Sequence, residues 1–256
     1  MSLDDLALTP RLLVALDFDG TLAPLVDEPL TARMTPAAAE AVAALVASPD
    51  TIVALVSGRS LADLRVIAEH DDDSSLFLAA SHGAETWTPG EEEPPSPEGT
   101  DPADAALRDA LIGEARALLA DIEGAWVEPK AFGFGIHSRL VADGRASEVH
   151  ERIDALMAQR APEWRRRSGH SITEFAFRPE GKDTAVADLR RRTGATGVLF
   201  AGDDVTDEDA LRSLGAEDVG VRVGPGETAA DVRVDGIEDL ARLLLSLAHR
   251  RSSARE

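Results

Sequence analysis

The chain has 256 residues, of which 44% are apolar, and it carries a formal net charge of −21 at pH 7. Apolar content of this size over this length predicts a folded core, and the negative charge excludes nucleic acid and anionic membranes as general partners. The absence of cysteine excludes disulfides, thiolate catalysis and cysteine-based zinc sites.

The same negative charge would repel an anionic substrate. A phosphate site would therefore need local positive charge from a metal ion, a lysine or arginines. The segment Met1–Asp5 lacks the basic start and apolar stretch of a secretory signal, and no window of the sequence reaches membrane-spanning length. We therefore expect a cytoplasmic protein that does not associate with membranes.

Four short apolar runs, each followed by a polar residue, recur along the chain. Such runs are typical of strands in a parallel sheet, whose carboxyl ends share one edge. Helical segments lie between the runs, and this alternation predicts the α/β class. The runs are Leu12–Leu16 before Asp17, Ile52–Val56 before Ser57, Leu76–Ala80 before Ser81, and Val198–Ala201 before Asp203. Helix starts are predicted at Thr35-Pro36, at Ser60 with Asp63, and at Thr206 with Asp209.

A second pattern interrupts this alternation after a connector rich in Pro, Gly and Glu between Thr88 and Pro102. One helix followed by two strands occurs twice, which predicts a small antiparallel α+β domain inserted into the first. The expected core is residues 1–100 and 178–256, the insertion is 101–177, and 250–256 is a frayed tail. The expected elements of the insertion are a helix over 102–122, strands over 126–130 and 132–141, a helix over 146–160, and strands over 164–167 and 171–177.

Two aspartates close the first apolar run, in the order Asp17-Phe18-Asp19-Gly20-Thr21. Two carboxylates suit phosphoryl transfer, because one can attack phosphorus while the other protonates the leaving oxygen and then activates water. The glycine and threonine form a turn whose backbone N–H groups can cradle phosphate. The alternative is a strand-end turn that the acids merely cap.

A second acidic cluster follows the last strong strand, as Gly202-Asp203-Asp204 with Asp207 close behind. Carboxylate oxygens are the ligands that Mg²⁺ prefers, so opposite Asp17 this cluster would complete a metal cage with Asp203 as the ligand. Glu208 and Asp209 are left to helix capping and dipole effects, because acids are common in a first helical turn.

Two further segments supply groups that bind phosphate. Ser57-Gly58-Arg59 offers a hydroxyl and backbone N–H groups after the second strand, although a serine before glycine is often only a helix cap. Lys182, at a helix start after the insertion, could neutralise both phosphate and nucleophile, although a loop lysine is ordinarily solvated. A nucleotide P-loop is excluded, because Asp183 follows the lysine and Ala176 occupies the first glycine position.

Strand alternation in the insertion puts polar residues on one face and aromatic or apolar residues on the other. If the apolar sides pack on the two helices, the polar face can hydrogen-bond a polyhydroxylated ligand. The alternative is a solvated sheet face. The polar residues are Glu128, Lys130, His137, Arg139 and Glu174, while His150 and His170 are expected on the surface.

The four segments around Asp17, Ser57, Lys182 and Asp203 resemble, in order and spacing, the motifs of the haloacid-dehalogenase-like phosphatases. This resemblance implies a Rossmann-like core with an inserted cap domain that determines substrate specificity. Leu16–Pro29, His82–Glu85 and Gly202–Asp209 more specifically look like trehalose-6-phosphate phosphatases, and the resemblance extends from about Leu12 to Leu245.

The resemblance also implies a role for each matching residue. Asp17 would be the nucleophile and Asp19 the general acid and base. Mg²⁺ would be held by Asp17, Asp203 and the main-chain carbonyl of Asp19, with Asp204 and Asp207 in support. The phosphate binders would be Gly20, Thr21, Ser57, Gly58, Arg59 and Lys182, and the sugar would be recognised by Glu128, Lys130, His137, Arg139 and Glu174.

The expected function is Mg²⁺-dependent hydrolysis of trehalose 6-phosphate through an aspartyl-phosphate, the last step of trehalose biosynthesis, by a monomer. One alternative is a related phosphatase acting on sucrose phosphate or mannosyl-3-phosphoglycerate. Another is a phosphosugar-binding regulator without catalysis, which would have no need for a general acid. Ser138 stands where an aromatic residue is common in the family, and Ala210-Leu211 replaces its usual apolar-Phe ending. Neither departure removes a catalytic group.

Overall fold

The computed structural model describes residues 2–90, 101–142, 144–169 and 171–254. The chain folds as two compact units, one comprising Met1–Ser96 and Glu180–Glu256, and the other Pro97–Pro179. In the part of the chain that is described, no helix combines the length and the apolar character needed to cross a membrane.

The first unit is built on a seven-stranded sheet with the order β11-β10-β9-β1-β2-β3-β4. All neighbouring strands pair in parallel except β3 and β4. The predicted α/β class with a parallel sheet is therefore confirmed. The strands are β1 Leu12–Leu16, β2 Thr51–Val56, β3 Phe77–Ala80, β4 Glu85–Trp87, β9 Gly197–Gly202, β10 Val219–Val223 and β11 Val232–Val234.

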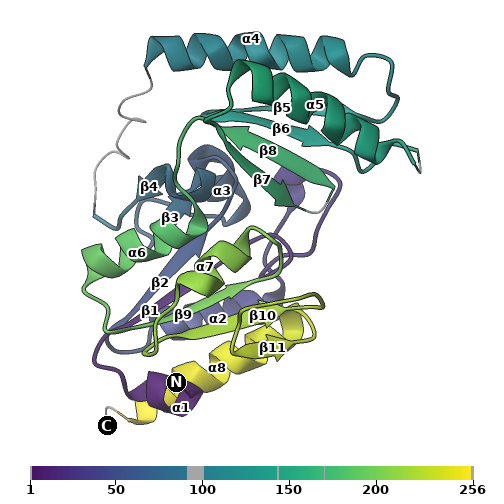
Figure 1. Ribbon diagram of the computed structural model, residues 1–256. Coiled ribbons are helices and arrows are strands. Elements are labelled where there is room, and N and C mark those ends of the chain that lie inside the picture. The colour runs from purple at the N-terminus through teal and green to yellow at the C-terminus, as the bar shows by residue number, and fades with distance from the viewer. Residues whose placement is uncertain (1, 91–100, 143, 170, 255–256) are drawn as a thin grey trace. The chain divides into compact units, whose positions relative to one another are not determined.

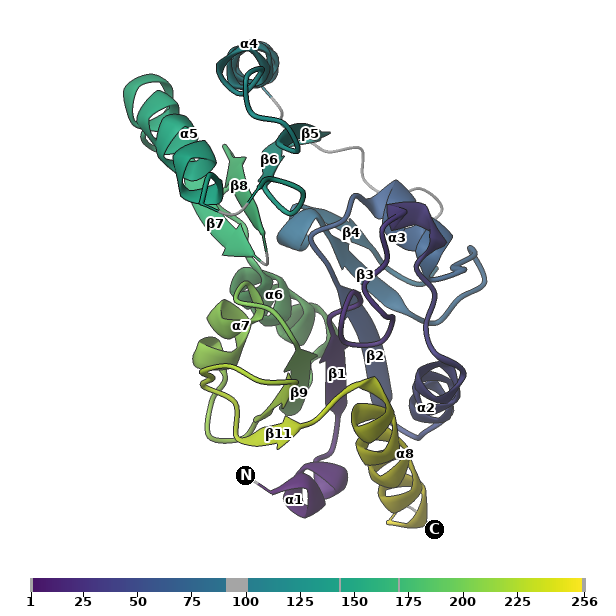
Figure 2. The ribbon, with the colours of Figure 1, turned by 90° about the vertical axis from the view of Figure 1, so that its right-hand side faces the viewer.

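Helices cover both faces of this sheet, which is why its central strands are continuously apolar. In β1, Leu12, Val14 and Leu16 belong to the apolar cluster that includes α2 and α8, whereas Leu13 and Ala15 belong to the cluster that includes α6 and α7. Figure 2 shows these two pairs of helices on opposite sides of the strands. The helices of the unit are α1 Leu3–Leu8, α2 Pro36–Val46, α3 Leu61–Ile67, α6 Lys182–Thr193, α7 Asp207–Ser213 and α8 Ile237–Ser253, with short 3-10 turns at Pro29–Thr31 and Ser81–Gly83.

All three predicted helix starts are confirmed in position, and two of them also have the expected capping bond. The Thr35 side chain accepts a hydrogen bond from the Ala38 N–H, and the Ser60 side chain accepts one from the Asp63 N–H. The capping bond expected at Thr206 is wrong: α7 does begin directly after this residue, but its backbone is already helical, with φ −67° and ψ −21°, and its side chain makes no capping bond.

The predicted frayed tail is also wrong, because α8 continues to Ser253 and Arg251 is fully buried. Its guanidinium donates hydrogen bonds to four main-chain carbonyls and one hydroxyl from segments near the start of the chain. Helices α1 and α8 lie side by side at this point (Figure 1). The acceptors are the carbonyls of Ala7, Thr9, Pro49 and Asp50 and the hydroxyl of Thr51.

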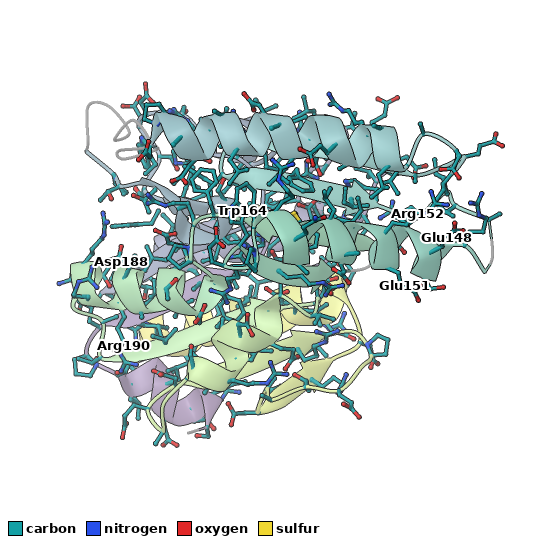
Figure 3. All side chains as sticks on the ribbon, turned by 45° about the horizontal axis from the view of Figure 1, so that its top comes forward. Glu148, Glu151, Arg152, Trp164, Asp188 and Arg190 are labelled. Carbon is teal, nitrogen blue, oxygen red and sulfur yellow. The ribbon has the colours of Figure 1, made fainter. Side chains whose placement is uncertain are left out.

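The second unit contains a four-stranded antiparallel sheet in the order β5-β6-β8-β7. Two helices pack on it through one apolar cluster that includes Phe134, Ile136 and Phe175. On α5, Glu148 and Arg152 form an ion pair, and Figure 3 labels both along this helix and Trp164 beside it. The elements are α4 Pro102–Leu118, β5 Trp126–Lys130, β6 Gly133–His137, α5 Ala146–Arg160, β7 Arg165–Gly169 and β8 Ile172–Ala176.

Several predicted boundaries in this unit are wrong. The first helix ends at Leu118 and not at 122, and β7 runs two residues further than expected. The strand predicted over 132–141 ends at His137, because the Val141 N–H turns back to the Ser138 carbonyl. Arg139 therefore lies in an exposed turn beyond the strand. Most of the predicted connector, residues 91–100, lies outside the described residues.

His150 was expected on the surface, but it is half-buried and both of its ring nitrogens have partners. Nε2 lies 3.1 Å from the Ser138 hydroxyl, and Nδ1 lies 2.9 Å from the Thr173 hydroxyl. The side chain therefore joins α5 to the sheet. His170, for which the same expectation was made, lies outside the described residues.

The buried Arg251 generates a stability prediction. Arg251→Ala should lower the free energy of unfolding by about 3 kcal/mol, because four carbonyls lose a charged donor at once. Arg250→Ala is the matched control, since Arg250 is half-exposed and pairs with the exposed Asp4; it should cost at most about 0.5 kcal/mol. Urea denaturation followed by circular dichroism measures both values, and equal small losses would contradict the argument.

Candidate active site

Three of the predicted site segments meet at the carboxyl ends of neighbouring strands. The register pairs Leu16 of β1 with Leu55 of β2 on one side and with Ala201 of β9 on the other. Asp17 and Asp203 follow β1 and β9, and the Asp17 N–H still donates to the Ala201 carbonyl. The parallel sheet therefore brings together aspartates that are 186 positions apart in the sequence.

Lys182 lies in the centre of this acidic group. Its Nζ is 2.6 Å from Asp17 Oδ1 and 2.6 Å from Asp207 Oδ1. All three residues are buried, with exposed fractions of 4%, 5% and 0% for Lys182, Asp17 and Asp207. Burial would lower the pKa of Lys182, but the two carboxylates outweigh it and hold the pKa above its ordinary value, so the ammonium stays charged.

Three carboxylates, those of Asp17, Asp203 and Asp207, can place one oxygen each within 4.8 Å of one another. Burial, together with the nearby negative charges of Asp207 and Asp203, raises the pKa of Asp17 despite the opposing charge of Lys182. Burial and the charge of Asp207 likewise raise the pKa of Asp203 to about 6. Among the described residues, this is the group of oxygen ligands that suits a divalent cation.

Asp207 orders the loop that carries Asp203. Its Oδ2 accepts hydrogen bonds from the N–H groups of Asp203 and Asp204, at 3.1 and 2.9 Å. A Cβ on Gly202 would lie only 2.2 Å from Asp207 Cγ, so glycine is needed for this close approach. The main-chain donors and Lys182 together occupy both oxygens of Asp207.

The turn after β1 is shaped by close contact with the second aspartate cluster. Gly20 has φ +81°, and a Cβ there would lie 2.1 Å from Asp203 Oδ2. Its N–H donates to the Ala23 carbonyl, so the expectation that this N–H is free for phosphate is wrong. The Thr21 hydroxyl lies 3.0 Å from Asp17 Oδ2 and 3.3 Å from Asp203 Oδ1, which links the two aspartates.

Arg59, a predicted phosphate binder, is paired with Asp19 in this structure. Its Nε and Nη2 donate to the two carboxylate oxygens of Asp19, at 2.6 and 2.7 Å, and its Nη1 donates to the Pro29 carbonyl. This bidentate pair forms because two N–H donors of a guanidinium match the two oxygens of a carboxylate. The Asp19 carboxylate is thus paired with Arg59, whereas Asp17, Asp203 and Asp207 form the cluster.

Ser57 is buried, with an exposed fraction of 2%, and its Oγ accepts a hydrogen bond from the Arg59 N–H at 3.2 Å. Gly58 packs against His82, since a Cβ would lie 2.7 Å from His82 Nε2. The following loop is secured by Glu85, whose carboxylate accepts from the Ser81 hydroxyl and the Leu61 N–H. His82 and Glu85, which belong to the segment that resembles the family, therefore fix the conformation of this loop.

Two buried residues that support the Asp203 loop were missed or misassigned by the sequence analysis. Glu208 was assigned to capping, but it is 4% exposed and accepts from the Ala229 N–H and from Arg222. Arg222 also donates to the Asp204 carbonyl at 2.9 Å, so it joins this loop to the one after β10. The sequence does contain a signal for Arg222, because this charged residue interrupts the apolar run as Val221-Arg222-Val223.

In the second unit, four of the five predicted sugar-binding residues lie together on the sheet face opposite the helices. His137 Nε2 lies 2.8 Å from Glu128 Oε2, and Lys130 Nζ lies 3.8 Å from the same oxygen and bonds to Glu174. Burial would raise the pKa of Glu128, but the hydrogen bond from His137 and the charge of Lys130 hold it below its ordinary value. Arg139 lies in the turn that follows β6.

The sheet register explains how these side chains reach across the strands. Glu128, Gly135, Glu174 and Arg167 form one row over β5, β6, β8 and β7. A Cβ on Gly135 would lie 3.1 Å from Ile172 Cδ1, 3.4 Å from Glu128 Oε2 and 3.5 Å from Lys130 Cε, so Gly135 lies against these three side chains. Arg167, which is 8% exposed, was missed because its strand was predicted to end there.

A mainly parallel sheet with aspartates at the carboxyl end of its central strand, together with an inserted α+β unit, defines a haloacid-dehalogenase-like phosphatase fold. Within that class, a family model described as trehalose-phosphatase matches residues 15–236. The chain therefore belongs to the trehalose-phosphatase family.

Two relatives and one solved structure illustrate the similarity. An uncharacterized glycosyl hydrolase of Mycobacterium tuberculosis is 35% identical over 256 residues, which cover 92% of this chain and 18% of that protein. Trehalose-phosphate phosphatase of Mycobacterium avium is 35% identical over 213 residues, covering 78% of this chain and 51% of that protein. The chain thus spans about half of the latter relative and less than a fifth of the former.

The solved structure is that of the C-terminal domain of Candida albicans trehalose-6-phosphate phosphatase. It superposes with a TM-score of 0.81 at 21% identity, covering 96% of this chain and 95% of that one. At this level of identity the match supports the fold.

The crowded aspartates generate a pH-dependent prediction for the metal-free protein. Because the folded-state pKa of Asp203, about 6, lies above its ordinary value of 3.8, its ionisation destabilises the fold as the pH rises from 4 through 6. Asp203→Asn should therefore be more stable than the wild type by about 2 kcal/mol at pH 7, and the difference should vanish near pH 4.

Urea denaturation in chelator at both pH values measures this difference. Asp209→Asn is the control, since its half-exposed carboxylate lies on α7, the helix that follows the Asp203 loop, and it should show no comparable gain. A variant at Asp203 that is less stable than the wild type at pH 7 would contradict the electrostatic argument.

Proposed function

We propose that this protein hydrolyses trehalose 6-phosphate to trehalose and phosphate, which is the last step of trehalose biosynthesis. The observation that carries the proposal is the buried contact of Lys182 with Asp17 and Asp207, at 2.6 Å each, beside Asp203. In a chain of the trehalose-phosphatase family, this arrangement supplies a nucleophile, a fixed positive charge and a group of metal ligands.

The donor set fits Mg²⁺. Asp17 and Asp203 offer carboxylate oxygens, and the raised pKa of each reflects buried negative charge that a cation would compensate. We assign the ion to these two carboxylates and the Asp19 main-chain carbonyl, with Asp204 in support. Asp207 is left out as a ligand because its oxygens bind Lys182 and two N–H groups. When bound, Mg²⁺ would neutralise charge on the phosphate and on Asp17.

Asp17 is the proposed nucleophile. Its carboxylate attacks phosphorus, and the bond from phosphorus to the sugar O6 breaks as the aspartyl-phosphate forms. Lys182 opposes the effect of burial on Asp17 and gives the incoming phosphate dianion a positive partner. Thr21, Ser57, Gly58 and the turn at Gly20 form the remaining wall of the phosphate site.

Asp19 is the proposed general acid and base. It donates a proton to the departing sugar oxygen and then accepts one from the water that attacks the aspartyl-phosphate. Both Asp19 carboxylate oxygens accept hydrogen bonds from Arg59, so Asp19 has to turn from Arg59 to the sugar oxygen before it can transfer a proton there. Arg59 can then donate to the phosphate oxygens. Its contact with Asp19 is therefore compatible with its predicted role as a phosphate binder.

We further propose that residues 97–179 act as the cap and bind the sugar. Glu128, Lys130, His137 and Glu174 present charged acceptors and donors on one sheet face, suited to hydroxyl groups. Arg139 would join them from its turn. Two alternatives are a related phosphatase of sucrose phosphate or mannosyl-3-phosphoglycerate and a phosphosugar-binding regulator. Substrate preference and turnover distinguish them from the proposed function.

Phosphate release from a panel of sugar phosphates tests the function directly. With Mg²⁺ present, trehalose 6-phosphate should be the preferred substrate, and excess chelator should abolish turnover until the metal is restored. Asp17→Asn should lose at least about 10⁴-fold in kcat while remaining folded by circular dichroism. Preference for another phosphate would reassign the substrate, and an inactive wild-type protein that binds trehalose 6-phosphate would favour the regulator.

The division between phosphate chemistry and sugar binding generates a second prediction. Lys130→Ala should lower kcat/KM for trehalose 6-phosphate by about 10²-fold, because Glu174 and a sugar hydroxyl lose their charged partner. Hydrolysis of a small aryl phosphate should change by less than about twofold. Arg152→Ala, on the charged side of α5 (Figure 3), is the control and should affect neither substrate. Equal losses on both substrates would instead assign Lys130 to folding.

A further inference from the structure

Trp126 is an exposed aromatic residue on the same sheet face as the polar group of the second unit. All three tryptophans fall in the described part of the chain, and Trp87 and Trp164 are 1% and 6% exposed, whereas Trp126 is 40% exposed. Trp126 begins the edge strand β5, two positions before Glu128. Alternation along the strand places these two side chains on one face.

The indole of Trp126 is held by a stacked contact. It lies opposite His137 in the β5–β6 register, with ring centroids 4.2 Å apart and ring planes 3° apart. His137 is fixed in turn by Glu128, at 2.8 Å from Nε2. The imidazole therefore covers one side of the indole, and the hydrogen bond to Glu128 limits rotation of the imidazole.

This combination restricts the chemistry of a ligand. An exposed indole favours a flat apolar surface, while the neighbouring carboxylates and ammonium favour hydroxyl groups. A pyranose ring has both features, since its axial C–H groups form an apolar face and its hydroxyls lie around the rim. A phosphate or nucleotide fits poorly, because Glu128 and Glu174 place two carboxylates beside the ring.

We infer that Trp126 is a stacking platform for one pyranose ring of the substrate's sugar part, in addition to the hydrogen-bonding residues of the cap. This inference rests on the proposed function and makes it more specific. A disaccharide offers one pyranose ring to the hydrogen-bonding residues and a second to the indole, whereas a monosaccharide phosphate has only one ring to offer. Trp126 therefore contributes to selection of a disaccharide phosphate over a monosaccharide phosphate.

Intrinsic fluorescence tests binding without turnover. Since Trp87 and Trp164 are buried, acrylamide should quench chiefly Trp126, and Trp126→Phe should lose most of the quenchable emission. Trehalose should reduce quenching of the wild-type protein, whereas an acyclic polyol, sorbitol, at equal osmolality should not. Equal quenching with and without trehalose would overturn the inference, and so would equal protection by sorbitol.

Kinetics test selectivity. Trp126→Ala should lower kcat/KM for trehalose 6-phosphate by about 10-fold, mainly through KM, and that for glucose 6-phosphate or an aryl phosphate by less than about twofold. Trp126→Phe, which keeps a stacking ring, should retain activity within about threefold. Leu118→Ala, an exposed apolar residue on α4, is the control and should change neither substrate.

The two proposals fail in different ways. A wild-type protein that hydrolyses no sugar phosphate, yet is protected from quenching by trehalose, would contradict the proposed function and support the sugar platform. The reverse outcome is a wild-type protein that hydrolyses trehalose 6-phosphate but is not protected from quenching by trehalose, together with a Trp126→Ala variant that loses activity equally on all substrates. That outcome would support the proposed function and contradict the sugar platform. If Trp126→Ala does not fold, the quenching experiment on the wild-type protein still decides.

Discussion

The site is organised around the ammonium of Lys182, which lies between the carboxylates of Asp17 and Asp207 and is almost completely removed from water. Breaking such a buried pair typically costs about 3–5 kcal/mol, because the remaining charge has no partner. Burial of any one of these three charged residues is therefore tolerated only because the other two are present. With Asp203 included, three carboxylates face one ammonium, and the surplus of negative charge is what a divalent cation would compensate.

The surrounding backbone follows from this contact. Asp207 reaches Lys182 only because Gly202 has no side chain, and Asp203 approaches the β1 turn only because Gly20 has none. Arg222 and Glu208 then hold the Asp203 loop from the side of β10. A rigid parallel sheet with short loops keeps these groups in place, which is the kind of preorganisation that electrostatic stabilisation of a phosphoryl group requires.

The second unit applies the same pairing of charges at an accessible surface. Lys130 contacts two carboxylates, as Lys182 does, but the pairs around it are partly exposed and open to displacement by hydroxyl groups. A buried triad suits a fixed chemical step, whereas a half-exposed network beside an indole suits recognition of a ligand that arrives and leaves.

The sequence by itself determined the class of the fold and the residues around which the site forms. Apolar runs ending at Asp17, Ser57 and Asp203 predicted parallel strands and their common edge, because a strand covered on both faces must be apolar along its whole length. The helix start at Lys182 followed from local pattern alone.

What only the tertiary structure decided depends on partners far apart in the chain. Burial of Arg251 requires carbonyls up to 244 positions away, and Arg59 meets Asp19 across 40 positions. The buried role of Glu208 comes from Arg222 on β10 and from Ala229 in the loop after it. The early end of β6 comes from a turn at Ser138. A local pattern reports which face of an element is apolar, whereas the partner of a charged side chain is set by the packing of the whole chain.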